Sequence, residues 1–148
     1  MRFSSVADDF FILCSFDGEL LDNTNRRPYI LVLRLTYKKN NYDFAIPFRS
    51  NIPNYIDKAL FFSLPPRPST QTNHIHGLHY VKMFPIKREY LRKFYTDKDP
   101  YYQMLEAHID KNVKTIISEA QAYLDEYEKG NKPDFCTDID GIIKALFT

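Results

Sequence analysis

The chain has 148 residues, of which 44% are hydrophobic. This length and composition predict one domain over residues 1–148 with a single core. Its 20 Lys and Arg residues nearly balance 19 Asp and Glu residues, which excludes binding to nucleic acid through the overall charge and leaves only a local basic patch.

The N-terminal segment has an apolar run at Phe10–Cys14 behind the acidic pair Asp8–Asp9. This short, aromatic-rich run predicts a short helix followed by a strand. A turn is expected at Phe16–Glu19, and the polar residues Asp22–Arg27 are expected to form a loop.

The next segment has the pattern of a β-hairpin. Two apolar runs, Tyr29–Leu35 and Tyr42–Pro47, flank the turn-prone connector Lys38–Asn41. In an antiparallel pair, residues that enter the first strand lie beside residues that leave the second. The hypothesis is a cationic, hydroxyl-containing corner, and the alternative is ordinary solvated strand ends. The residues of this corner are Arg26, Arg27, Arg49, Ser50 and Asn51.

The central segment is punctuated by prolines. Pro47 and Pro53 bracket the polar residues after the hairpin, which predicts a restrained loop. Asn54–Phe62 is expected to be a short helix or irregular. The proline-rich stretch Leu64–Asn73 predicts a loop, and the alternating residues Leu78–Ile86 predict a strand.

The C-terminal half contains the strongest helix signal. Asp99-Pro100 has the pattern of an N-cap followed by proline at the first helical position. Apolar residues then recur at three- and four-residue steps until Gly130, which predicts one long helix with an apolar face. A last short helix is expected within Phe135–Thr148, capped by Thr137 or Asp138.

Three histidines, His74, His76 and His79, fall within six residues. They could bind a metal, transfer protons at a substrate, or pack in the structure. No carboxylate or cysteine at a fitting spacing completes a metal-ligand set. Cys14 and Cys136 likewise lack the spacing of a zinc site or a disulfide framework.

The sequence lacks the P-loop, GxGxxG, GxSxG and HExxH motifs, which removes common nucleotide-binding, hydrolase and metalloprotease interpretations. Chemistry that needs only positioned cations, hydroxyls and a histidine is still possible. RNA cleavage is such a chemistry, because RNA carries its own nucleophile in the 2′-hydroxyl. No stretch resembles an export signal or approaches a membrane span, so we expect a cytoplasmic protein without a membrane partner.

Four short stretches together resemble the ToxN/AbiQ family, the RNase toxins of bacterial type III toxin–antitoxin systems. The similarity extends over residues 1–129. It implies an α+β fold with a strongly curved, mainly antiparallel, barrel-like sheet, beside the long helix and short flanking helices. It also implies a metal-independent endoribonuclease inhibited by a repeat-encoded RNA antitoxin. The stretches are Arg27-Pro-Tyr-Ile-Leu-Val, Ile46-Pro-Phe-Arg-Ser-Asn, Gly77-Leu-His-Tyr-Val-Lys-Met-Phe-Pro-Ile and Pro100-Tyr-Tyr-Gln-Met-Leu.

The resemblance also implies site residues. Family members place a basic residue at the start of the first hairpin strand and a Thr-Ser pair after the second. Here those positions are Arg26 or Arg27, and Arg49 with Ser50. Arginine replaces the common lysine, and Arg49 replaces the common threonine, so Ser50 is the one hydroxyl of the pair that is retained. The general base would then lie elsewhere, and the three histidines are candidates.

Our sequence-based interpretation is an endoribonuclease toxin that acts by 2′-hydroxyl attack, in phage defence or plasmid maintenance. It needs no cofactor, binds substrate RNA and an inhibitory repeat RNA, and is not expected to bind DNA. The alternatives are a non-catalytic RNA-binding module and a metal-dependent hydrolase that uses the three histidines. The candidate catalytic residues are Arg27, Arg49, Ser50 and His76, and the candidate RNA-binding residues are Arg26, Tyr29, Asn51, His74, His79, Lys82, Lys87 and Arg88.

Overall fold

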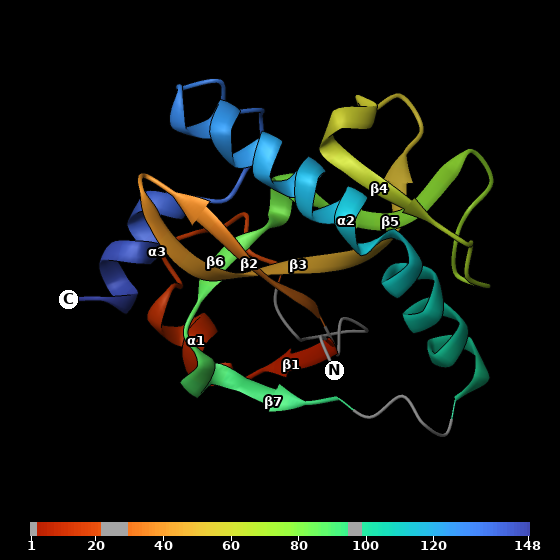
Figure 1. Ribbon diagram of the computed structural model, residues 1–148, viewed down its shortest axis with the longest axis horizontal. Coiled ribbons are helices and arrows are strands. Elements are labelled where there is room, and N and C mark those ends of the chain that lie inside the picture. The colour runs from red at the N-terminus through yellow and green to blue at the C-terminus, as the bar shows by residue number, and fades with distance from the viewer. Residues whose placement is uncertain (1–2, 22–29, 95–98) are drawn as a thin grey trace.

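The computed structural model describes residues 3–21, 30–94 and 99–148 (Figure 1). Short 3-10 turns, η1 (Lys58–Leu60), η2 (Tyr80–Lys82) and η3 (Arg88–Tyr90), connect several of its elements. The helices are α1 (Asp8–Leu13), α2 (Pro100–Glu128) and α3 (Ile139–Leu146). The strands are β1 (Phe3–Val6), β2 (Ile30–Tyr37), β3 (Asn40–Pro53), β4 (Phe61–Leu64), β5 (His74–His79), β6 (Phe84–Ile86) and β7 (Leu91–Lys93).

Within the described residues, the strands form one sheet in the order β4-β5-β3-β2-β1-β7, and β6 pairs with β3. Every pairing is antiparallel. The predicted mixture of an antiparallel sheet with a long helix is therefore confirmed. The barrel-like closure is not confirmed, because the outer strands β4 and β7 do not pair with each other in the described part of the chain.

The side-chain alternation of β2 divides the interior into two layers. Leu31, Leu33 and Leu35 pack against α2, whereas Ile30 points to the other face of the sheet. That other face is covered by Phe10 of α1 and by the apolar residues of α3. Figure 1 shows the result, with α2 along one side of the sheet and α1 and α3 on the other. No helix in the described ranges is both long enough and apolar enough to span a membrane.

The predicted β-hairpin is confirmed. β2 and β3 pair from Ile30 opposite Pro47 to Tyr37 opposite Asn40. The two-residue turn between them holds Lys38 and Lys39 at φ angles of 48° and 66°. Positive φ at both turn positions matches the twist of a hairpin but is unusual for lysine.

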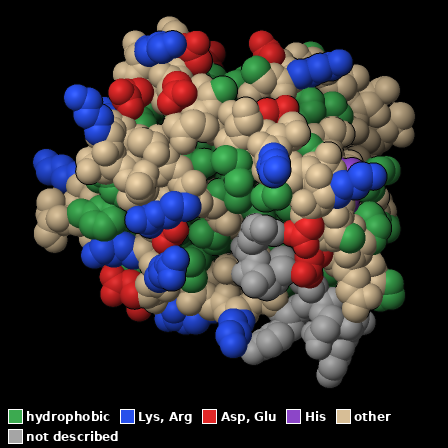
Figure 2. All heavy atoms as spheres, viewed as in Figure 1, with side chains coloured by type: hydrophobic (Ala, Val, Ile, Leu, Met, Phe, Trp, Pro, Cys, Tyr) green, Lys and Arg blue, Asp and Glu red, His purple; other side chains and the backbone are tan. Residues whose placement is uncertain are grey.

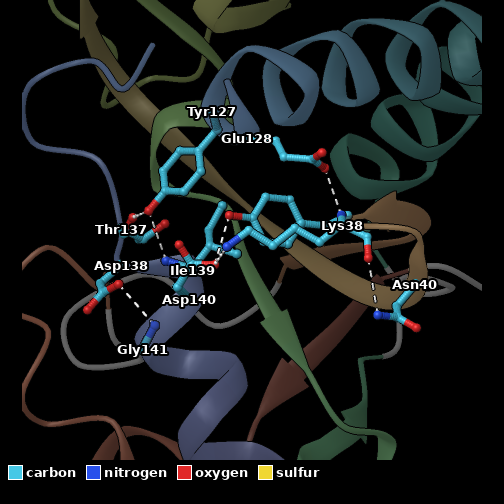
Figure 3. Close-up of polar contacts among 10 residues, drawn as sticks. Lys38, Asn40, Tyr127, Glu128, Thr137, Asp138, Ile139, Asp140 and Gly141 are labelled. Carbon is cyan, nitrogen blue, oxygen red and sulfur yellow. Dashed lines mark hydrogen bonds and ion pairs between the residues drawn. The ribbon is translucent and has the colours of Figure 1, made fainter. Parts of the chain in front are cut away.

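Contacts from the C-terminal helices hold this turn (Figure 3). The backbone N–H of Lys38 donates to Glu128 Oε1 at 2.7 Å, and the Lys38 ammonium lies 2.9 Å from Asp140 Oδ1. The Tyr37 hydroxyl donates to the same Asp140 oxygen at 2.9 Å. The hairpin tip is therefore fixed by α2 and α3, which compensates for its unfavourable turn residues.

The predicted caps of both C-terminal helices are confirmed. Asp99 accepts a hydrogen bond from Tyr101 N at 2.9 Å before α2. Gly130 follows the end of α2 with a φ of 97°, a conformation that glycine adopts without steric cost. Asp138 caps α3 through Gly141 N at 3.0 Å.

Two predicted segments are wrong in order or extent. At the N-terminus the strand β1 precedes the helix α1. In the run Phe10–Cys14, all residues but Cys14 belong to α1, and Cys14 follows the helix directly. Helical spacing lets Phe10 and Cys14 both face the core. The predicted strand Leu78–Ile86 is instead divided, because β5 ends at His79 and η2 separates it from β6.

Candidate functional site

The polar end of β3 lies inside the sheet and not in the loop predicted between Pro47 and Pro53. Beyond Pro47 this strand leaves β2 and pairs with β5, with Arg49 opposite Gly77. The register then shifts before Ile52. Such an irregularity re-aims the side chains within it and is common beside functional sites.

Arg49 and His79 lie on the same face of this strand pair. Arg49 Nη1 is 3.1 Å from His79 Nδ1. A guanidinium only donates hydrogen bonds, so Nδ1 accepts and the ring proton of His79 is on Nε2. Burial, together with the smaller effect of the nearby charges of Arg49 and Lys82, lowers the pKa of His79 to about 3. The imidazole is therefore neutral at neutral pH and holds Arg49 in place.

Ser50 and Asn51 contact the proline-rich loop 65–73. The Ser69 and Ser50 hydroxyl oxygens are 3.2 Å apart and share a hydrogen bond in which either hydroxyl can be the donor. Asn51 Oδ1 accepts from Gln71 N at 2.6 Å, and Asn51 Nδ2 donates to Ser69 O at 3.2 Å. The Asn51 amide, predicted to contact RNA, is thus engaged in fixing the loop beside Ser50.

Gly77 lets three strands meet closely beside Arg49. A Cβ atom on this residue would lie 2.6 Å from the carbonyl oxygen of Phe62 on β4 and 3.3 Å from Cδ1 of Ile52 on β3. Any larger residue would force these strands apart. The tight packing of β4, β5 and β3 therefore supports the position of Arg49.

His76, a predicted catalytic residue, faces away from Arg49. It is almost fully buried, with its Nδ1 atom 2.8 Å from Pro65 O and 3.1 Å from the Tyr101 hydroxyl. Because a carbonyl only accepts, Nδ1 carries the ring proton. Burial lowers the pKa of His76, an effect that the bond to Pro65 opposes and Arg67 reinforces. This placement does not favour His76 as the proton-transfer residue beside Ser50.

The three histidines do not converge on one point. His74 Nδ1 lies 3.1 Å from Thr72 O, while His76 and His79 have the separate partners described above. Within the described residues, no group of three His, Cys, Asp or Glu side chains is placed to hold a metal ion. The three-histidine hydrolase is therefore not supported in this part of the chain.

Three further cations were predicted to bind RNA, of which Lys82 is buried and Lys87 and Arg88 lie away from Ser50. The Lys82 ammonium is buried and donates to Glu19 Oε1 at 2.7 Å and to Phe135 O at 2.8 Å. Its role in the structure is to tie two distant segments together, so the RNA-binding prediction for Lys82 is not supported. Lys87 and Arg88 follow β6, which pairs with β3 between Asp43 and Ala45, toward the opposite end of that strand.

Arg26, Arg27 and Tyr29, which were also predicted to form the site, lie outside the described residues. Of the corner predicted from the hairpin, the structure therefore describes only the residues on β3, namely Arg49, Ser50 and Asn51.

The structure adds residues that the sequence patterns did not indicate. Arg67 lies over the rings of Tyr101 and Tyr102, at 5.2 and 5.7 Å from their centroids. This contact and the Pro65 carbonyl link the proline-rich loop to the first turn of α2. Ser69 reaches Ser50 from the same loop. No sequence spacing could have revealed these contacts, because the loop has no periodic pattern.

Comparisons with known proteins show that this chain shares its fold with solved structures. No protein-family model and no curated protein sequence matches the chain. Several solved structures do match, three of them over nearly the whole length of both chains. The first, from a bacterial antiviral system regulated by a processed non-coding RNA, has a TM-score of 0.75 and 16% identity over 97% of this chain and 96% of that one.

The second is AbiQ, a lactococcal anti-phage endoribonuclease of the type III toxin–antitoxin system, with a TM-score of 0.70 and 18% identity over 98% of this chain and 95% of that one. The third is from a bacterial type III system in which a non-coding RNA pseudoknot selectively inhibits the toxin. Its TM-score is 0.67, with 14% identity over 96% of this chain and 93% of that one. At such identities the likeness shows the fold, and the fold resemblance predicted from the sequence is confirmed.

Proposed function

We propose that this chain, which has the fold of AbiQ and related type III toxin–antitoxin structures, is a single-domain endoribonuclease toxin. It acts in the cytoplasm without a metal and is held inactive by a repeat-derived RNA. The observation that carries the proposal is the placement of Arg49 and Ser50 toward one end of β3, with His79 of β5 beside Arg49. The fold match over nearly the full length of both chains adds a fold-level analogy to an endoribonuclease.

The reaction follows from what RNA itself supplies. The 2′-hydroxyl oxygen attacks the adjacent phosphorus, and the bond from phosphorus to the 5′ oxygen of the next nucleotide breaks. The 2′-hydroxyl loses a proton and the departing 5′ oxygen gains one, which yields a cyclic phosphate and a 5′-hydroxyl. The protein must align these groups and stabilise the negative charge on the phosphate.

Each residue of the site has a role in this proposal. Arg49 binds the phosphate oxygens and stabilises the charge that develops on them. Ser50 donates a hydrogen bond to the scissile phosphate and accepts one from Ser69, an arrangement that the two rotatable hydroxyls permit. His79 replaces His76 in our assignment, as a neutral positioning residue that holds the guanidinium through Nδ1.

Cleavage of a short RNA by the purified protein in EDTA tests the proposal. We expect a product with a cyclic phosphate end. Ser50→Ala should reduce the cleavage rate more than RNA affinity, whereas Arg49→Ala should reduce both. Arg92→Ala is a matched control, because Arg92 is an exposed arginine of β7 that bonds only nearby carbonyls among the contacts described. Near-normal cleavage by both site variants would place the site elsewhere.

Two other outcomes separate the alternatives. RNA binding without cleavage by the unmodified protein would favour a non-catalytic RNA-binding module. Loss of cleavage in EDTA, restored by added metal, would favour a metal-dependent hydrolase. For the inhibitory partner, the DNA just upstream of the reading frame should contain a tandem array of short repeats. Co-expression of that array should relieve the growth arrest that the protein causes.

A further inference from the structure

A pocket of about 540 Å³ lies at the hairpin end of the sheet, away from Arg49. It is formed by the start of β3 with β2, by the residues that follow β6, and by Phe147 after α3. This volume is within the range of small-molecule sites and exceeds what one ordered water or ion requires. Arg49 follows Asp43 of this pocket by six positions on β3, a distance of roughly 20 Å along an extended strand.

One wall of the pocket is cationic and held in place. Asp43 is the anchor, with only 10% of its side chain exposed. Its two oxygens hold two guanidiniums, since Arg34 Nη1 lies 3.4 Å from Oδ1 and Arg88 Nε lies 3.3 Å from Oδ2. One carboxylate cannot neutralise two arginines, and each guanidinium has five N–H donors. The trio therefore has a net positive charge and further donors for an anion.

These two arginines are accessible to a ligand. The Arg34 and Arg88 side chains are 61% and 85% exposed, although both are tied to a buried anchor. A fixed pair of guanidiniums suits the oxygens of a phosphate group, because planar N–H donors match their geometry. In Figure 2, several Lys and Arg side chains lie on the side of the molecule that holds the β2–β3 hairpin and α3, with Asp and Glu side chains among them.

The other wall is aromatic. Phe147 is 51% exposed, and its ring lies 5.6 Å from that of Tyr42 at an angle of 56°. The Lys87 ammonium lies 4.9 Å from the Phe147 ring centroid. Accessible aromatic rings beside cations are the combination with which proteins bind unpaired nucleotides, by stacking the base and contacting the phosphate.

We propose that this pocket binds one unpaired nucleotide of an RNA, with the phosphate on Arg34 and Arg88 and the base against Phe147. It is a second RNA contact, separate from the site at Arg49. Its identity as an RNA contact rests on the proposed function, but nucleotide binding itself does not require cleavage. An RNA that occupies both places must extend over several nucleotides, since roughly 20 Å of strand lies between them.

Amide chemical shifts of the protein, titrated with adenosine 5′-monophosphate, inorganic phosphate and adenosine, test the pocket directly. We expect the nucleotide to shift residues 41–43, 86–88 and 147, and to bind more tightly than phosphate or adenosine alone. Arg88→Ala and Phe147→Ala should each weaken nucleotide binding by roughly 5- to 10-fold. Arg92→Ala removes the same charge elsewhere and should leave the affinity unchanged.

Cleavage assays separate this inference from the proposed function. Arg88→Ala and Phe147→Ala should each weaken binding of a long single-stranded RNA. Both variants should cleave a dinucleotide at the normal rate. Nucleotide-induced shifts in a protein that cleaves no RNA would refute the proposed function and support the pocket. Shifts that miss the pocket, or equal weakening by Arg88→Ala and Arg92→Ala, would overturn the inference. Equal affinity for phosphate and nucleotide, unaffected by Phe147→Ala, would also overturn it.

Discussion

Replacing Tyr127 by phenylalanine should destabilise the protein strongly, although it removes a single oxygen atom. The Tyr127 hydroxyl donates to Thr137 O at 2.9 Å and accepts from Ile139 N at 3.1 Å (Figure 3). All three residues are buried. The hydroxyl therefore satisfies two backbone groups in the connection between α2 and α3.

The size of the effect follows from those two groups. Phenylalanine keeps the ring and its apolar contacts, so the loss is confined to hydrogen bonds. A buried polar group left without a partner costs about 1–3 kcal/mol, which gives roughly 2–6 kcal/mol for the pair. Each kcal/mol lowers the melting temperature of a chain of this size by about 2–4 °C, so we expect a decrease of about 4–24 °C, with unchanged helix content before melting.

Tyr123, one turn earlier on α2, provides the control. Its hydroxyl is buried and has no hydrogen-bond partner among the described residues. Tyr123→Phe makes the same chemical change but removes a group that is already unsatisfied, so it should be neutral or stabilising. Urea unfolding followed by circular dichroism measures both variants. If both lose the same free energy of unfolding, the Tyr127 hydroxyl does not hold the connection as described.

Three further predictions concern stability. Gly77→Ala should cost about 1–3 kcal/mol, because its Cβ would lie 2.6 Å from Phe62 O; an unchanged urea midpoint would contradict this. Burial lowers the folded pKa of His76, and burial with the nearby charges of Arg49 and Lys82 lowers that of His79 to about 3. The unfolded chain thus binds more protons below about pH 6.5 and stability falls as pH decreases from there, with His79 contributing about 1.4 kcal/mol per pH unit. His79→Gln should flatten this dependence in urea titrations at pH 7.5, 6 and 5. Asp99→Ala should cost about 1 kcal/mol through loss of the α2 cap, and Asp99→Asn should restore most of it in thermal melts.

Local signals in the sequence were sufficient for some elements. The β2–β3 hairpin and both ends of α2 are encoded by patterns within the segments themselves, namely apolar alternation, the Asp99 cap and Gly130. The end of β3 could not be predicted in this way. Its partner β5 lies beyond the proline-rich loop, and pairing with a distant strand leaves no local pattern.

The choice among the histidines shows the same limit. Side chains alternate between the two faces of a strand, so His76 and His79 lie on opposite faces of β5. The helix that covers the strand then decides which of these faces packs against apolar rings. Tyr101 of α2 occupies the face of His76, which leaves His79 beside Arg49. Side-chain chemistry could identify the candidate residues, and the packing of α2 was needed to distinguish them.

The ties between the hairpin and α3 also set the order in which the protein can fold. Tyr37 bonds Asp140 across a separation of 103 residues, and the second core layer is incomplete until Ile142 and Leu146 dock. A growing chain can pair β2 with β3 early, but the lysine turn is secured only when α3 has left the ribosome. Phe147, which lines the nucleotide pocket, is made later still. We expect the pocket to be assembled only after the hairpin, α2 and α3 have all been synthesised.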